Sequence, residues 1–407
     1  MSTTRHSRLL IGVAVAVTLS ASLVAASPAV AHPSTPTITT WISGLNAPRG
    51  VTFDGRGNLY VAESGRAGSG TEGLTHTGKV SKYARGSTTP TWSTGFDSLY
   101  VTEDPSQPPD ALGPEGISAL GNGCSSTERE REDGTGCQLR MIMSESRDGV
   151  AAGLGIDAPQ AGLLYRLDGA SGRARSVSNF GDQQYKWTGD HTSLFPSDFP
   201  DSNPYGVLVL RDRETHQVRT FVADAGANTI SEVMANGLAR VIAYIPNETA
   251  PPFRDATPTC IAQGPDGMLY VATLNFVANL FVSHSGQSNV WRVDPDANFP
   301  TVPTVWATGL TTATACTFDR SGNFWATEMF QPNSAGPPGD VVRIPFRHPT
   351  QLDRFGGGML PLPGGIAQGP DGAMYISINS ANPTPGSGAV VRLGTVRDRD
   401  REHGGDD

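Results

Sequence analysis

Residues 44–65 read GLNAPRGVTFDGRGNLYVAESG, and the fold prediction depends on the pattern in this stretch. A short apolar run leads into a turn that carries Asp and Gly, and a second run with an aromatic residue, LYVAE, follows. Glycine supplies the positive φ angle that a tight turn between two antiparallel strands needs. The stretch therefore predicts a β-hairpin that ends in an acidic residue, Glu63.

The same pattern returns along the chain. Clear copies are TPTCIAQGPDGMLYVAT from Thr257, TATACTFDRSGNFWATE from Thr312 and LPGGIAQGPDGAMYISI from Leu362. Fainter copies begin at Gly113 and Asn203. Each copy is followed by a third strand-like run, such as GKVSKYA or GDVVRIP, and several by a fourth. A four-stranded unit of about 50 residues is typical of a propeller blade, because such a sheet buries both faces only by stacking between neighbours.

Six such units predict an all-β fold, a six-bladed β-propeller with four-stranded antiparallel blades. The last unit stops after its third strand at Gly394, whereas TITTWISGL at residues 37–45 resembles a missing fourth strand. We expect this amino-terminal strand to complete the sixth blade and close the ring, which removes two open sheet edges. A single propeller domain over residues 32–396 follows, and the charged segment 397–407, which lacks apolar anchors, is expected to be a disordered tail.

The composition of the 407 residues agrees with this prediction. The 48 Gly and 31 Pro suit a fold of short strands and many turns. A formal net charge of −9 without a basic stripe argues against a nucleic-acid partner. We expect a monomer.

The amino terminus predicts export. Arg5 and Arg8 precede an apolar run, and small residues up to Ala31 fit a cleavage site. We therefore expect a signal peptide over residues 1–31 and a secreted, extracellular protein. An uncleaved anchor is the alternative for this run. No later stretch is apolar enough to span a membrane once the signal is removed.

Four cysteines in an exported chain can be oxidised. Cys124 and Cys137 bracket a polar segment without apolar residues, which favours a local disulfide. Cys260 and Cys316 lie on the first strands of neighbouring blades, one residue out of register with each other. For this second pair, a disulfide between blades and two buried thiols are both open.

The units PRGVTFDGRGNLYVAESG, PTCIAQGPDGMLYVAT and GGIAQGPDGAMYIS resemble those of the secreted ScyD/ScyE family, propeller proteins related to NHL-repeat proteins. The resemblance covers nearly all of residues 37–394. It implies a six-bladed fold and export, and it brings no established chemistry to carry over.

In a propeller, the first strand of each blade lines the central channel and the second strand returns to the channel mouth. Two sets of residues should therefore meet there. The mouth ring comes from the P-x-G-like start of each unit: Arg49, Glu115, Tyr205, Thr259, Thr314 and Gly364. The strand-end ring closes each second strand: Glu63, Glu145, Asp224, Thr273, Glu328 and Ile378. The charged and phenolic members of both rings are the candidate ligand-binding residues: Arg49, Glu63, Glu115, Glu145, Tyr205, Asp224 and Glu328.

Two interpretations stay open for the acids of the strand-end ring. They can accept hydrogen bonds from the amides of neighbouring loops, which is a structural role. They can also bind a ligand or a metal, because crowded carboxylates raise a pKa or recruit a cation. Glu115 and Asp224 are the candidate metal ligands, and oxygen ligands suit Ca²⁺ better than Zn²⁺. No other cofactor is expected.

The sequence favours an exported propeller that binds an unknown small molecule or extracellular partner at an acidic channel mouth. The first alternative is a Ca²⁺-type lactonase or esterase-like hydrolase similar to the gluconolactonase group, which holds its metal with a Glu, two Asn and an Asp. Neither ring contains an asparagine, so whether the protein is an enzyme stays open and no catalytic residue is assigned. His76, in a loop expected over the mouth, is the candidate general base if a substrate binds there. The second alternative is a protein-interaction platform on the outer blades.

Overall fold

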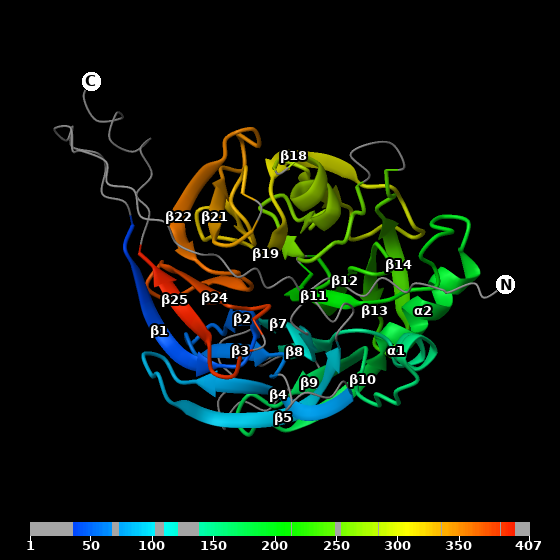
Figure 1. Cartoon of the computed structure of the whole chain (residues 1–407), viewed down its shortest axis with the longest axis horizontal. Helices are drawn as coiled ribbons and strands as arrows, with labels where there is room; N and C mark the ends of the chain where they lie inside the picture. Colours follow the sequence, from blue (N-terminus) through cyan, green and yellow to red (C-terminus); the bar gives the residue numbers. More distant parts are fainter. Residues whose placement is uncertain are drawn as a thin grey trace.

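The computed structural model describes residues 36–66, 73–101, 110–120, 138–212, 214–248, 254–283, 285–334, 336–382 and 384–394. The predicted signal peptide, the charged tail and the Cys124–Cys137 pair lie outside these residues. Within them, the chain forms the predicted six-bladed β-propeller, with six antiparallel sheets around a central channel (Figure 1). None of the described helices is both long and apolar enough to cross a membrane.

The first three blades follow one another along the chain. Blade 1 consists of β2 (Pro48–Phe53), β3 (Leu59–Glu63), β4 (Gly73–Tyr83), β5 (Pro90–Val101) and β6 (Asp110–Leu112). Blade 2 consists of β7 (Pro114–Leu120), β8 (Gln138–Met143), β9 (Leu163–Leu167) and β10 (Ala174–Asn179). Blade 3 consists of β11 (Pro204–Arg211), β12 (Val218–Asp224), β13 (Thr229–Val233) and β14 (Ala239–Tyr244). The fifth strand of blade 1, β6, departs from the predicted four.

The last three blades complete the circle. Blade 4 consists of β15 (Ala262–Gln263), β16 (Leu269–Ala272), β17 (Ser288–Val293) and β18 (Thr304–Leu310). Blade 5 consists of β19 (Ala313–Phe318), β20 (Phe324–Glu328), β21 (Gly339–Ile344) and β22 (Asp353–Leu360). Blade 6 consists of β23 (Ile366–Gln368), β24 (Met374–Ile378), β25 (Gly388–Leu393) and the amino-terminal strand β1 (Ile38–Leu45).

The ring closes as predicted. Strand β1 pairs antiparallel with β25, from Ile38 opposite Leu393 to Leu45 opposite Gly388. The two strands come from opposite ends of the described chain and lie side by side at the edge of the ring in Figure 1. The pairing covers the edge of β25 that would otherwise stay open, and β1 becomes the outermost strand of blade 6.

The repeat has a physical reason in the turn between the first two strands. In blade 1, the Asp54 carboxylate accepts hydrogen bonds from the Asn58 amide side chain at 2.8 Å and from the Tyr60 hydroxyl at 3.0 Å. In blade 5, Asp319 accepts in the same way from Trp325 Nε1 at 2.8 Å. The turn aspartate therefore fixes the aromatic ring of the second strand, which explains why the two residue types recur together.

Hydrophobic clusters fill the junctions between neighbouring blades. Tyr60 and Ala62 of blade 1 pack with Leu139 and Met141 of blade 2, for example. The glycine of the P-x-G start allows the first strands to approach one another around the channel. A Cβ atom on Gly50 would lie 2.5 Å from the carbonyl oxygen of Glu115, so a larger residue would push blades 1 and 2 apart.

Three helical segments interrupt the strands and were not predicted. Helix α1 (Arg147–Leu154) lies between the second and third strands of blade 2, and α2 (Phe180–Asp190) connects blade 2 to blade 3. A π-helical turn, η1 (Ala278–Ser283), lies between the second and third strands of blade 4. By their place between strands, all three segments belong to the same face as the starts of the first strands.

Candidate functional site

The mouth ring surrounds a cavity at the axis of the propeller. The cavity has a volume of about 70 Å³ and is lined by residues that lie in, or directly before, the first strand of each of the six blades. Arg49, Glu115, Tyr205, Thr259 and Thr314 of the predicted ring all line it. The structure therefore brings together the five mouth-ring side chains that the register of the repeat aligned. Whether they bind a ligand stays a prediction.

The charged half of the ring is a buried cluster centred on Arg49. The Arg49 guanidinium donates from Nη2 to both carboxylate oxygens of Asp110, at 2.9 and 3.1 Å. Its Nη1 lies 3.5 Å from the Tyr205 hydroxyl, and its Nε lies 3.7 Å from Glu115 Oε1. The Arg49, Asp110 and Glu115 side chains are all less than a tenth exposed.

Sequence reasoning missed Asp110. This residue begins β6, the extra strand that runs antiparallel to the end of β5 and brings the chain back to the channel. Because β6 has no counterpart in the other blades, the repeat gave no register from which to place it. The remaining signal was an acidic residue four positions before Pro114, at the start of the next unit.

Glu115 is the least satisfied member of the cluster. Ser64 Oγ donates to its Oε1 at 3.3 Å, whereas its Oε2 is buried and has no hydrogen-bond partner among the described residues. Burial raises the pKa of Glu115 to about 7, although Arg49 opposes this shift. Burial also raises the pKa of Tyr205 to about 12, so Tyr205 is a neutral donor at physiological pH. Burial alone would lower the pKa of Arg49, but Glu115 and Asp110 outweigh it and the guanidinium stays charged.

The other half of the ring is neutral and is occupied with holding blades together. Thr259 Oγ1 donates to the Ala313 carbonyl of blade 5 at 2.8 Å, and Thr314 Oγ1 donates to the Pro363 carbonyl at 2.8 Å. Cys260 and Cys316 also line the channel here and form a disulfide between blades 4 and 5. The structure thus resolves the two alternatives for this pair in favour of the disulfide.

The acids of the strand-end ring support the loops of their own blades. Glu63 accepts a hydrogen bond from the Asn46 amide at 2.8 Å and lies 3.3 Å from Lys79 Nζ. Asp224 accepts from the Asn203, Gly226 and Ala227 amides and from the Ser202 hydroxyl, at 2.7 to 3.1 Å.

Glu328 repeats the arrangement in blade 5. It accepts from the Thr311 amide at 2.6 Å and pairs with Arg354 at 3.0 Å. The loop-supporting interpretation therefore describes the contacts of Glu63, Asp224 and Glu328. A ligand role for these acids remains a prediction.

Glu145 and His76 are the two remaining candidates from the sequence. Glu145 follows the second strand of blade 2 with a positive φ of 62°, and its amide donates to Asn203 Oδ1 at 3.3 Å. His76 Nδ1 lies 2.6 Å from Asp97 Oδ1, and the imidazole is largely exposed. Both residues of the His76–Asp97 pair belong to blade 1, on β4 and β5, and neither lines the channel cavity.

Glu115 and Asp224 are the predicted metal ligands. Glu115 offers one buried oxygen, but Asp224 lies in another blade and its carboxylate is already an acceptor of the four hydrogen bonds named above. In the part of the chain that the structure describes, no group of three His, Cys, Asp or Glu side chains converges on a point where a metal ion could be held. The described residues form no such three-ligand group, and the Glu115–Asp224 calcium site stays a prediction.

No family model and no curated protein matches the chain. Solved structures that are similar to the chain include regucalcin from Agrobacterium tumefaciens, described as a calcium-binding protein, at 14% identity over 87% of this chain and 91% of the other, with a TM-score of 0.44. The PQQ-bound aldose sugar dehydrogenase from Streptomyces coelicolor matches at 12% identity, with 89% and 99% covered and a TM-score of 0.47. A putative gluconolactonase matches at 12% identity, with 90% and 96% covered and a TM-score of 0.44. The ScyD/ScyE resemblance stays a prediction.

Proposed function

We propose that the protein is an exported binding protein whose channel mouth takes the ammonium group of a small amine. The observation that carries this proposal is the unsatisfied Oε2 of Glu115, buried beside a cavity at the propeller axis. A buried acceptor without a donor costs free energy, so a donor that enters the cavity is favoured.

The balance of charge selects a cationic donor. Asp110 already neutralises Arg49 through two short hydrogen bonds. The ionised Glu115 would then leave one excess negative charge in a buried site, and the site can neutralise it by taking either a proton or a cation. The raised pKa of Glu115, about 7, reflects neutralisation by a proton. A bound ammonium group would neutralise Glu115 in the other way, as a cation.

The size of the cavity sets the size of the group. A volume of about 70 Å³ admits a head group of a few heavy atoms and leaves the rest of a longer molecule outside the mouth. Glu115 would accept from the ammonium group, and Tyr205 would position it from blade 3. The ligand class is therefore a primary amine on a flexible or extended body.

The test measures the binding of methylammonium chloride and of putrescine at constant ionic strength. Thermal shift and NMR titration detect the binding. We expect binding to tighten by about tenfold per pH unit between pH 5 and pH 7, because only the ionised Glu115 pairs with the amine, and to level off above the pKa. Glu115→Gln should abolish binding and its pH dependence.

The matched control is Glu214→Gln, which changes an exposed glutamate in the turn between β11 and β12. This variant should bind both amines as the unmodified protein does. Methanol serves as a neutral probe of similar size to methylammonium. Equal binding of methanol and methylammonium, or unchanged amine binding in Glu115→Gln, would overturn the proposal.

The hydrolase alternative has a specific observation in its favour, since a buried carboxyl group with a pKa near 7 is suited to general acid–base catalysis. Its test is the rate of glucono-δ-lactone hydrolysis with about 1 mM CaCl₂, without CaCl₂, and after treatment with EDTA. This calcium concentration is about the dissociation constant of the weakest extracellular calcium sites. A calcium-dependent rate that Glu115→Gln removes would favour the hydrolase. A protein-interaction platform would instead keep its partner in the Glu115→Gln variant.

A further inference from the structure

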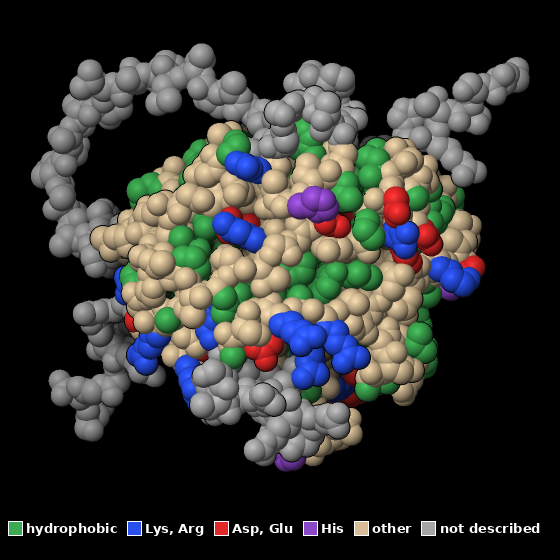
Figure 2. All heavy atoms as spheres, turned by 90° about the horizontal axis from the view of Figure 1, so that it is seen from below, with side chains coloured by type: hydrophobic (Ala, Val, Ile, Leu, Met, Phe, Trp, Pro, Cys, Tyr) green, Lys and Arg blue, Asp and Glu red, His purple; other side chains and the backbone are tan. Residues whose placement is uncertain are grey.

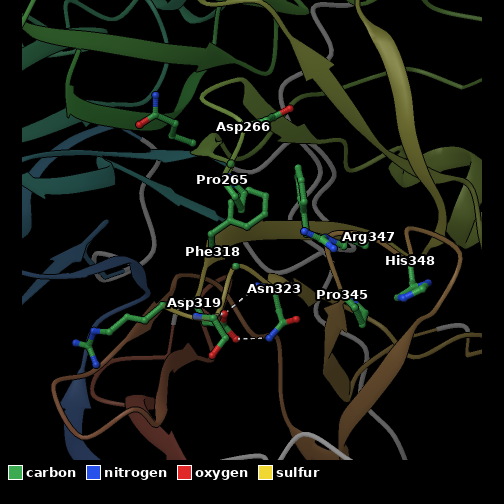
Figure 3. A pocket seen from close by; sticks show the side chains of 14 residues that line it. Pro265, Asp266, Phe318, Asp319, Asn323, Pro345, Arg347 and His348 are labelled. Carbon is green, nitrogen blue, oxygen red and sulfur yellow. Dashed lines mark hydrogen bonds between the residues drawn. The ribbon is translucent and has the colours of Figure 1, made fainter. Parts of the chain in front are cut away.

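A wide groove lies on the face opposite the channel mouth. It has a volume of about 890 Å³ and is formed by three turns of blades 4 and 5 (Figure 3). These turns connect β15 to β16, β19 to β20, and β21 to β22. Two of them follow first strands and one follows a third strand, all on the side of the ring away from Arg49 and Glu115, so the groove and the mouth are separate sites.

The groove has an aromatic floor. Phe318 and Phe346 both line it and are both partly exposed. Each packs edge-on against Tyr270, with ring centroids 5.2 and 5.8 Å apart. This packing fixes the two rings, so the part of each ring that stays uncovered is a rigid apolar surface facing the groove.

The carboxylates of the groove are used within the protein. Asp319 accepts from the Ser321 and Asn323 amides, from the Asn323 side chain and from Trp325, at 2.8 to 2.9 Å. The Asp319–Asn323 bond is drawn in Figure 3. Asp266 pairs with Arg292 at 2.9 Å and accepts from Tyr270 at 3.1 Å. Arg292 neutralises Asp266, so Asp319, which is held by neutral donors, is the one groove carboxylate without an ion pair among the described residues.

The basic side chains of the groove are in the opposite situation. Arg320, Arg347 and His348 line it and are exposed, and none of the three side chains forms a hydrogen bond or an ion pair with another described residue. Figure 3 shows the Arg347 guanidinium directed toward the middle of the groove, with His348 at its edge. A site of positive charge therefore persists on a chain with a formal net charge of −9.

We propose that this groove is a second binding site, for a short saccharide that carries carboxylate groups. The flat apolar face of a sugar ring packs on Phe318 and Phe346, and Arg347 makes a bidentate pair with a carboxylate. The volume is within the range of ligand sites and exceeds what one ring needs, which favours a short chain over a single unit. Guanidinium groups pair with carboxylates in a geometry that neutral sugars do not offer.

The test is titration of the full exported protein with digalacturonate. Isothermal calorimetry and NMR detect the binding. Maltose is the neutral disaccharide probe, and inorganic phosphate is the anion without a ring. We expect digalacturonate to bind and Arg347→Gln to weaken it by at least about tenfold, the effect of one lost charged hydrogen-bond pair. Binding should weaken with added NaCl, because the groove is open to solvent.

The matched control is Arg173→Gln, an exposed arginine in the turn between β9 and β10, on the same face but in blade 2. It should bind digalacturonate as the unmodified protein does. Equal binding in Arg347→Gln, or binding of maltose or phosphate as tight as that of digalacturonate, would overturn the proposal. Glu115→Gln should leave digalacturonate binding unchanged, so failure at the groove and failure at the mouth are told apart.

Discussion

Single buried carboxyl groups carry much of the pH sensitivity expected of this protein. Asp340 lies opposite Glu328 across β20 and β21, and both side chains are almost fully buried. Burial raises the pKa of Asp340 to about 9, and the neighbouring Glu328 adds to the shift. Arg354 lies 3.8 Å from Asp340 and pairs more closely with Glu328. Asp340 is therefore expected to keep its proton in the folded state at neutral pH.

Asp340→Asn should flatten the pH dependence of stability. In the unmodified protein the folded state holds a proton on Asp340 that the unfolded state releases above about pH 4. The free energy of unfolding should therefore fall as pH rises from about 4 toward 9, and the asparagine variant should lose this slope. Urea unfolding at pH 5, 6, 7 and 8 measures it.

The control for this prediction is Asp190→Asn, which changes an exposed aspartate paired with Lys186 at 2.9 Å. Its slope should match that of the unmodified protein. A slope in Asp340→Asn as steep as in the control would show that other groups produce the pH dependence.

At the scale of elements, the blades are joined by polar as well as apolar contacts, and one contact is covalent. The Cys260–Cys316 disulfide connects β19 to the segment preceding β15, and the two cysteines are 56 positions apart in the sequence. The Thr259 and Thr314 hydroxyls join adjacent blades beside it. At the other end of the ring, Ser377 Oγ donates to the Arg49 carbonyl at 3.0 Å and joins blade 6 to blade 1.

Replacing both cysteines of this pair by serine should lower the free energy of unfolding by about 2 to 4 kcal/mol, because the unfolded chain gains the entropy of an open loop of this length. Differential scanning calorimetry of the oxidised protein and the double variant measures the shift in Tm. Reduction of the unmodified protein should reproduce most of it. A double variant as stable as the oxidised protein would show that blade packing alone holds this junction.

At the scale of the whole molecule, stability depends on a ring closed by its first strand. Ile42 and Leu45 of β1 are buried in the cluster that joins blade 6 to blade 1. On the side of the ring seen in Figure 2, the basic side chains form several small groups, and acidic side chains lie next to most of these groups.

A protein that begins after Leu45 should lose this closure. Strand β25 would become an open edge, and the apolar cluster under β1 would be exposed, so we expect a lower Tm and self-association through strand pairing. Light scattering coupled to size-exclusion chromatography detects the association. The control is a chain shortened by residues 397–407, which follow the last described strand, β25, in the sequence. A shortened amino terminus that stays monomeric with an unchanged Tm would contradict the role given to β1.

The sequence by itself determined the repeating part of this protein. The turn aspartate, the glycines and the aromatic residue recur because each blade needs the same hairpin and the same close approach at the channel, so their register predicted six blades, the closing strand and the mouth ring. The contacts between segments that do not align with one another in the repeat were decided only by the tertiary structure. Asp110 reaches Arg49 through the extra strand β6, and Cys260 bonds Cys316 across two blades. Phe318, Phe346 and Arg347 meet in a groove made by separate turns. Such meetings follow from how blades pack, and no local pattern of residues encodes them.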